Sequence, residues 1–77
     1  MKSVLKQKIE QGLIKKVNLL NYRDLLLEFK EKGGSQEDAI GILNDLRVSA
    51  TNEDIDDRIL EILDFATGWC NIELKVW

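Results

Sequence analysis

Proline is absent from the 77-residue sequence, and its five glycines stand at positions 12, 33, 34, 41 and 68. Proline and glycine most often interrupt regular structure, so a chain with so few of them can form long helices. Most of these glycines separate stretches whose apolar residues recur at helical spacing. The sequence therefore predicts an all-α fold with short connections between its helices.

Four helices are expected. The first covers about residues 2–11 and ends at Gly12, a left-handed C-terminal cap. The second covers about residues 19–32 and ends at the Gly33–Gly34 pair, the third reaches about residue 48, and the fourth stops at Gly68. Side chains that can accept from the free amides of a first helical turn precede the last three helices, namely Asn18, Ser35 and the competing pair Thr51 and Asn52.

The apolar stripes of these helices indicate one core. The inward positions are Leu19, Tyr22, Leu25, Leu26 and Phe29, then Ala39, Ile40, Leu43 and Leu46, then Ile55, Ile59, Ile62, Leu63 and Ala66. Leu63 is predicted to be central, and Gly41 is expected where another helix crosses closely. A chain of this length has room for a single core, so residues 1–77 are predicted to form one small three- to four-helix bundle. Residues 69–77 are predicted to form an irregular or short extended tail because no partner strand is available.

The residue types argue against catalysis. Histidine is absent and Cys70 is the only cysteine, which removes the usual catalytic triads, zinc sites and any intrachain disulfide. We therefore expect a protein that is not an enzyme and has no cofactor or metal. Lysines interrupt the first eleven residues, which argues against a secretory signal, and no apolar window is long enough to span a membrane. A cytoplasmic location is expected.

One spacing resembles a calcium loop. Asn52, Asp54 and Asp56 follow the i, i+2, i+4 pattern of an EF-hand. The sixth position is Asp57 where the turn requires glycine, and the twelfth is Leu63 where a bidentate glutamate is required. The cluster is therefore interpreted as an acidic helix start.

Charge is divided unequally along the chain. Residues 1–34 carry a net charge of +4 and residues 35–77 a net charge of −7. Glu53, Asp57, Glu61 and Asp64 lie mostly off the apolar stripe of the fourth helix, so they can present one negative face to a basic protein, although an acidic face can also serve solubility alone. The predicted apolar anchors beside this face are Trp69 and Trp77, which could instead close the end of the core.

The segments LLLEFKEKGGSQEDAIGILNDLR and DRILEILDFATGWC and the terminal KVW resemble a group of small bacterial helical proteins, over about residues 22–77. Some small acidic helical proteins of this kind resemble immunity proteins, which bind and neutralise toxin domains. The resemblance implies a helical fold and a protein partner, and no residue in it is a diagnostic motif.

The leading hypothesis is a protein-binding module, such as an immunity or inhibitor protein that neutralises a basic toxin domain through its acidic helix. A self-associating structural module is the first alternative, and a homo-oligomer is possible. A helix-turn-helix nucleic-acid-binding regulator is the second alternative, but the acidic residues of the fourth helix would be repelled by phosphates.

Overall fold

The computed structural model describes residues 2–69 and 72–77, and side chains from residue 4 onward within these ranges. It contains four helices: α1 (Lys2–Lys15), α2 (Leu19–Glu31), α3 (Gln36–Ser49) and α4 (Glu53–Thr67). No strand occurs in the described part of the chain, so the predicted all-α class is confirmed. Among the described residues, none of the helices combines the length and the apolar character needed to cross a bilayer.

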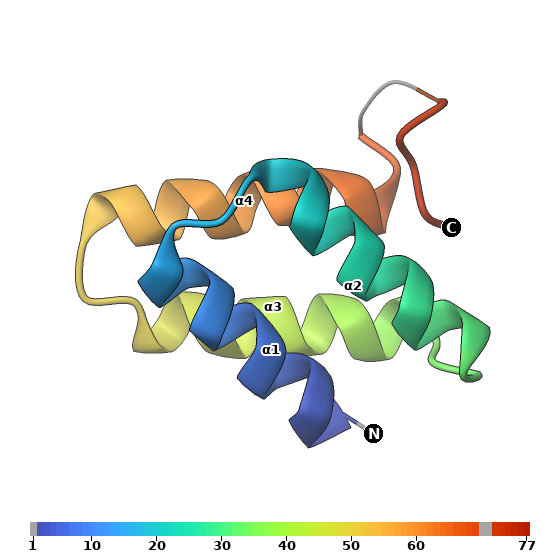
Figure 1. The fold of residues 1–77 in the computed structure, drawn as a ribbon, viewed down its shortest axis with the longest axis horizontal. Coiled ribbons are helices and arrows are strands. Elements are labelled where there is room, and N and C mark those ends of the chain that lie inside the picture. The colour runs from blue at the N-terminus through green and yellow to red at the C-terminus, as the bar shows by residue number, and fades with distance from the viewer. Residues whose placement is uncertain (1, 70–71) are drawn as a thin grey trace.

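The helices pack as a small bundle in which each has two main neighbours. The α3 and α4 helices pair most closely, while α1 contacts α2 and α3, and α2 contacts α1 and α4. In Figure 1 the pair formed by α1 and α2 lies in front of the pair formed by α3 and α4. Each helix therefore buries a stripe of side chains against two others, and the stripes meet in a single core.

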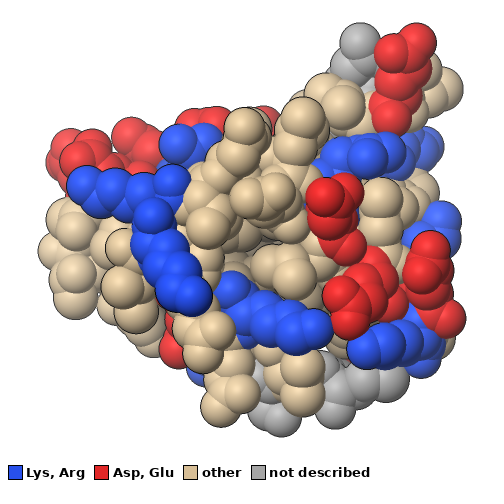
Figure 2. Space-filling model, viewed as in Figure 1, with Lys and Arg blue, Asp and Glu red and all other residues tan. Residues whose placement is uncertain are grey.

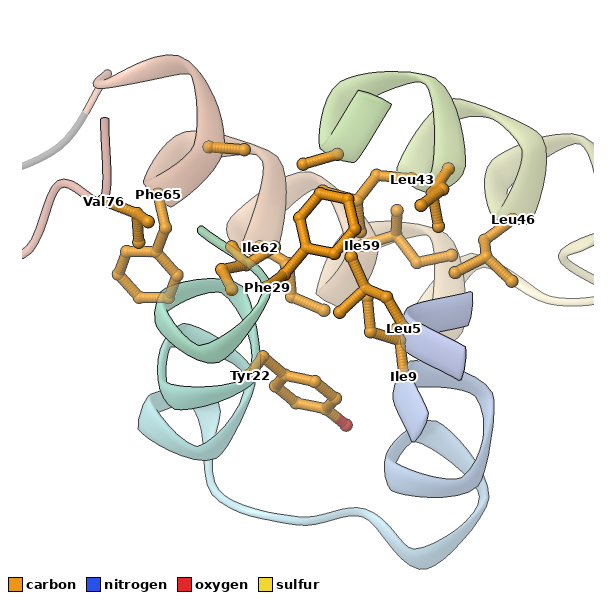
Figure 3. Packing of buried hydrophobic residues seen from close by; sticks show 14 residues of the cluster. Leu5, Ile9, Tyr22, Phe29, Leu43, Leu46, Ile59, Ile62, Phe65 and Val76 are labelled. Carbon is orange, nitrogen blue, oxygen red and sulfur yellow. The ribbon is translucent and has the colours of Figure 1, made fainter. Parts of the chain in front are cut away.

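The core draws on every helix and on the tail. Figure 3 shows Leu5 and Ile9 of α1 meeting side chains of α2, α3 and α4. The largest fully buried side chains are Ile9, Tyr22, Leu26, Leu43, Ile59 and Ile62. The prediction that Leu63 is central was wrong, because Leu63 is only partly buried. The α4 helix packs against both α2 and α3, and its buried stripe consists instead of Ile59, Ile62, Phe65 and Ala66.

The first helix is longer than predicted. It continues through Gly12 to Lys15, and Lys16 takes the left-handed conformation that was assigned to Gly12, with φ 57°. The Val17 amide then donates to the Gly12 carbonyl at 3.2 Å, which closes the last turn as in a Schellman motif. Gly12 is buried inside the helix, and its position reflects packing against Tyr22 rather than a helix end.

The other helix ends follow their predicted caps. The side chains of Asn18, Ser35 and Asn52 accept hydrogen bonds from the amides of Leu20, Asp38 and Ile55, so Asn52 and not Thr51 begins α4. Gly68 ends α4 with φ 85°. The expectation of a close helix crossing at Gly41 was wrong: an added Cβ atom would meet nothing within 4 Å.

The tail folds back onto the bundle without forming a strand. Arg23 and Lys30, seven residues apart on α2, donate to the carbonyl groups of Leu74 and Val76, both at 2.8 Å. The Val76 amide donates to the Phe65 carbonyl of α4 at 3.2 Å, and the Val76 side chain is buried beside Phe65 (Figure 3). The tail thus closes the core where α2 and α4 meet, in the irregular form that was one of the two predicted.

Candidate protein-binding face

The predicted acidic residues of α4 share one side of the helix. Glu53, Asp57, Glu61 and Asp64 are separated by four, four and three residues, which returns each side chain to the same side. All four side chains are exposed. They are called the acidic face below. In Figure 2 acidic side chains gather at the edge of the molecule where α4 begins, whereas lysines and arginines lie beside further acidic side chains on the side formed by α1 and α2.

The acidic face keeps most of its charge free of internal partners. Glu61 pairs with Arg58, with Nη1 and Oε2 3.3 Å apart. Within the described part of the chain, Glu53, Asp57 and Asp64 form no ion pair. Exposed pairs such as Arg58–Glu61 contribute at most about 1 kcal/mol, so an incoming cation can compete for Glu61.

Asp56, a neighbouring acidic residue, is not part of the acidic face because it pairs with Arg47. Asp56 points away from the face and accepts a hydrogen bond from Arg47 Nε of α3 at 3.0 Å. This contact ties the start of α4 to the end of α3. The acidic cluster at the start of α4 is therefore divided between a structural pair and a surface open to solvent.

An apolar side chain lies among the carboxylates. Leu60 is 39% exposed and stands three residues after Asp57 and four before Asp64, which places it on the same side of α4. The sequence analysis missed Leu60. Its position between acidic residues and off the inward stripe was the available signal. The acidic face thus places an apolar side chain among charged ones, as in an interface with an apolar core and a polar rim.

The two tryptophans are in different environments. Trp69 directly follows the Gly68 cap of α4 and is 84% exposed, so it is available to a partner. Trp77 is partly buried and packs edge-on against Phe29, with ring centroids 6.5 Å apart and an interplanar angle of 72°. Only Trp69 has the exposure that a docking anchor requires. Trp77 contributes to the core, as the alternative interpretation of the sequence had it.

Potential metal ligands are not gathered within residues 2–69 and 72–77. No group of three or more His, Cys, Asp and Glu residues is arranged to hold a metal ion among the described residues. Cys70 lies outside the described residues.

No family model, no curated protein and no solved structure matches the chain. Its function has to be inferred from the surface that its own residues build.

Proposed function

We propose that the protein is a non-catalytic binding protein whose acidic face docks on a basic surface of a protein partner. The observation that carries the proposal is the position of Leu60 among four exposed carboxylates on one side of α4. Leu60 adds apolar area among the carboxylates. A docking surface uses such area, because burial of apolar side chains supplies affinity, while complementary charge mainly speeds association and selects the partner.

A bacterial toxin domain with a basic cleft is the partner class that we favour, which makes the protein an immunity or inhibitor protein. A cleft that holds nucleic acid carries lysines and arginines, and these would pair with Glu53, Asp57, Glu61 and Asp64. Trp69 would add an apolar contact at the end of the face, where its side chain is 84% exposed.

The experiment compares two doubly charge-reversed variants. The protein is used to isolate its partner from the native host, and the dissociation constant of the identified complex is then measured at low and high salt. Asp57→Lys/Asp64→Lys alters the acidic face. Glu31→Lys/Asp45→Lys makes the same change in net charge on α2 and α3, away from the face, at two exposed positions.

We expect the first variant to bind at least about tenfold more weakly, the loss that corresponds to about 1.4 kcal/mol. The control variant should bind like the wild type. Leu60→Ala should also weaken binding, with little change in the salt dependence. If the two charge-reversed variants weakened binding equally, the effect would come from net charge and not from the acidic face. An acidic partner, or binding that salt leaves unchanged, would contradict the proposal.

A further inference from the structure

We propose that a hollow at the junction of α1, α2 and α4 binds a small zwitterion of the α-amino acid class with an aliphatic side chain. The hollow has a volume of about 240 Å³, and six residues line it: Leu13, Lys16, Tyr22, Asp54, Ile55 and Arg58. None of them belongs to the acidic face. Arg58 pairs with Glu61 of that face, but the inference does not rest on the proposed protein partner.

The first observation concerns the Tyr22 hydroxyl. The Tyr22 side chain is 1% exposed, and in Figure 3 its hydroxyl points from α2 toward α1. This hydroxyl has no hydrogen-bond partner among the described residues. Every fully buried polar side-chain atom of the described residues does have a partner, so the Tyr22 hydroxyl oxygen is not fully buried. The hydroxyl oxygen therefore remains accessible, and the hollow that Tyr22 lines is where it is reached. A carboxylate oxygen that enters the hollow can accept a hydrogen bond from it.

The protonation state of Tyr22 suits a donor. Burial raises the pKa of the Tyr22 hydroxyl above its usual value, and the nearby Arg58 guanidinium opposes this shift only in part. The hydroxyl consequently keeps its proton at neutral pH and can donate it to a carboxylate oxygen.

The second observation concerns the backbone at Lys16. Its φ of 57° lies in the left-handed region, which lysine rarely adopts and which glycine adopts without strain. The helix end needs only that backbone conformation, so a glycine would serve the α1 terminus better. Lys16 lines the hollow, and backbone strain of this kind concentrates at functional sites.

The lining matches the three parts of an aliphatic amino acid. Lys16, Arg58 and the Tyr22 hydroxyl are donors suited to a carboxylate. Asp54 is the acceptor suited to an ammonium group, and Leu13 and Ile55 offer an aliphatic wall. The volume is below the roughly 300 to 1,000 Å³ of pockets for drug-sized ligands, which restricts the occupant to a small molecule.

A second hollow, between α1 and α2, does not offer this combination. Its walls include Val4, Leu25 and Phe29, and its charged residues already pair with one another. Glu28 Oε1 accepts from Lys8 at 3.1 Å and from Lys32 at 2.9 Å. In the hollow beside Tyr22, Lys16 and Asp54 form no ion pair within the described residues, and Arg58 pairs only with the exposed Glu61, at 3.3 Å. Its lining therefore offers donors, an acceptor and an apolar wall.

The test uses L-leucine and its two halves as probes. Amide chemical shifts of the labelled protein are followed by NMR during titration with L-leucine, with 4-methylpentanoate, which lacks the amino group, and with isoamylamine, which lacks the carboxylate. We expect saturable shifts near Lys16, Tyr22 and Ile55 with L-leucine at millimolar concentration. Each half-ligand should bind at least about tenfold more weakly, because each loses a set of charge-assisted hydrogen bonds.

Two variants then examine the residues that carry the inference. Tyr22→Phe keeps the ring in the core and removes only the hydroxyl, and Lys16→Gly removes the ammonium group from the rim. Each should weaken L-leucine binding by about tenfold, the effect of one hydrogen bond to a charged group. Glu31→Gln, on an exposed site outside the hollow, should leave binding unchanged.

Three results would overturn the inference. The first is the absence of saturable shifts around the hollow with L-leucine. The second is equal affinity for 4-methylpentanoate, which would leave the amino group and Asp54 without a role. The third is unchanged L-leucine binding in the variants. Should Tyr22→Phe fail to fold, Lys16→Gly decides alone, since it relieves backbone strain.

Discussion

The ring of Tyr22 lies directly against Gly12, ten residues earlier in the chain. A Cβ atom at position 12 would come within 2.9 Å of Tyr22 Cε1 and within 3.1 Å of Val17 Cγ2. Distances that short require movement of the neighbouring atoms. The absence of a side chain at Gly12 therefore allows α1 and α2 to approach each other with an aromatic ring between them.

This relationship predicts opposite effects for two glycine-to-alanine substitutions. Gly12→Ala improves helix propensity but overpacks the contact with Tyr22, so the free energy of unfolding should fall, by up to about 1 to 3 kcal/mol. Gly41→Ala has the same propensity gain, and its Cβ meets nothing within 4 Å. It should raise the free energy of unfolding by about 1 kcal/mol. Urea unfolding measures both, and a Gly12→Ala protein as stable as Gly41→Ala would disprove the close contact.

The helix terminus at Lys16 predicts a stabilising substitution. A left-handed residue other than glycine costs about 1 to 2 kcal/mol, so Lys16→Gly should raise the free energy of unfolding by about 1 kcal/mol. Lys15→Gly is the matched control, because Lys15 is the last residue of α1 and precedes the left-handed position. It should lower stability by up to about 1 kcal/mol. A destabilised Lys16→Gly protein in thermal unfolding would mean that the lysine side chain outweighs the strain.

Substitutions at two adjacent residues of α4 test which side of the helix is buried. Ile62 is fully buried, whereas Leu63 is only partly buried. Ile62→Ala should lower the free energy of unfolding by about 2 to 5 kcal/mol. That range is comparable to the whole stability expected of so small a domain, about 3 to 5 kcal/mol, so the variant should be largely unfolded. Leu63→Ala should remain mostly folded by circular dichroism. The reverse order would place Leu63 at the centre of the core.

Local signals explain what the sequence could predict. Caps at Asn18, Ser35, Asn52 and Gly68 depend on hydrogen bonds and backbone angles within a few residues. Asn18, Ser35 and Gly68 were predicted outright, and Asn52 was one of two competing candidates. The acidic face was predicted for a similar reason, because helical spacing alone sets which residues share a side. The acidic face was predicted to be exposed because the apolar stripe lies on the opposite side of the same helix.

Contacts between distant segments explain what the sequence could not predict. Gly12 resembled a helix end, and only the packing of Tyr22 from another helix gives it a place inside α1. The sequence of α4 does not show that two other helices, α2 and α3, pack against it. Because of this packing Phe65 is buried in the core and Leu63 is only partly buried. The hollow beside Tyr22 joins three helices and has no signature within any one of them.

The ion-pair cluster at Glu28 predicts a weak dependence of stability on acid. Hydrogen bonds from Lys32 and then Lys8 hold the pKa of the Glu28 carboxyl below its usual value. A carboxyl whose pKa is lower in the folded protein binds protons more readily in the unfolded chain. The ion pairs of Glu28 therefore add to the free energy of unfolding above the unfolded pKa of about 4.3, and this contribution is lost as the pH falls through the folded pKa.

Glu28→Gln tests this directly. The difference in unfolding free energy between the wild type and Glu28→Gln should favour the wild type near neutral pH and shrink below about pH 4.3, since both side chains are then uncharged. The effect should be small and should diminish in high salt, because Glu28, Lys8 and Lys32 are substantially exposed. Glu31→Gln, next to the cluster but outside its ion pairs, is the control. A Glu28 difference that stays constant from neutral pH to well below the carboxyl range would show that the charge does not contribute through these lysines.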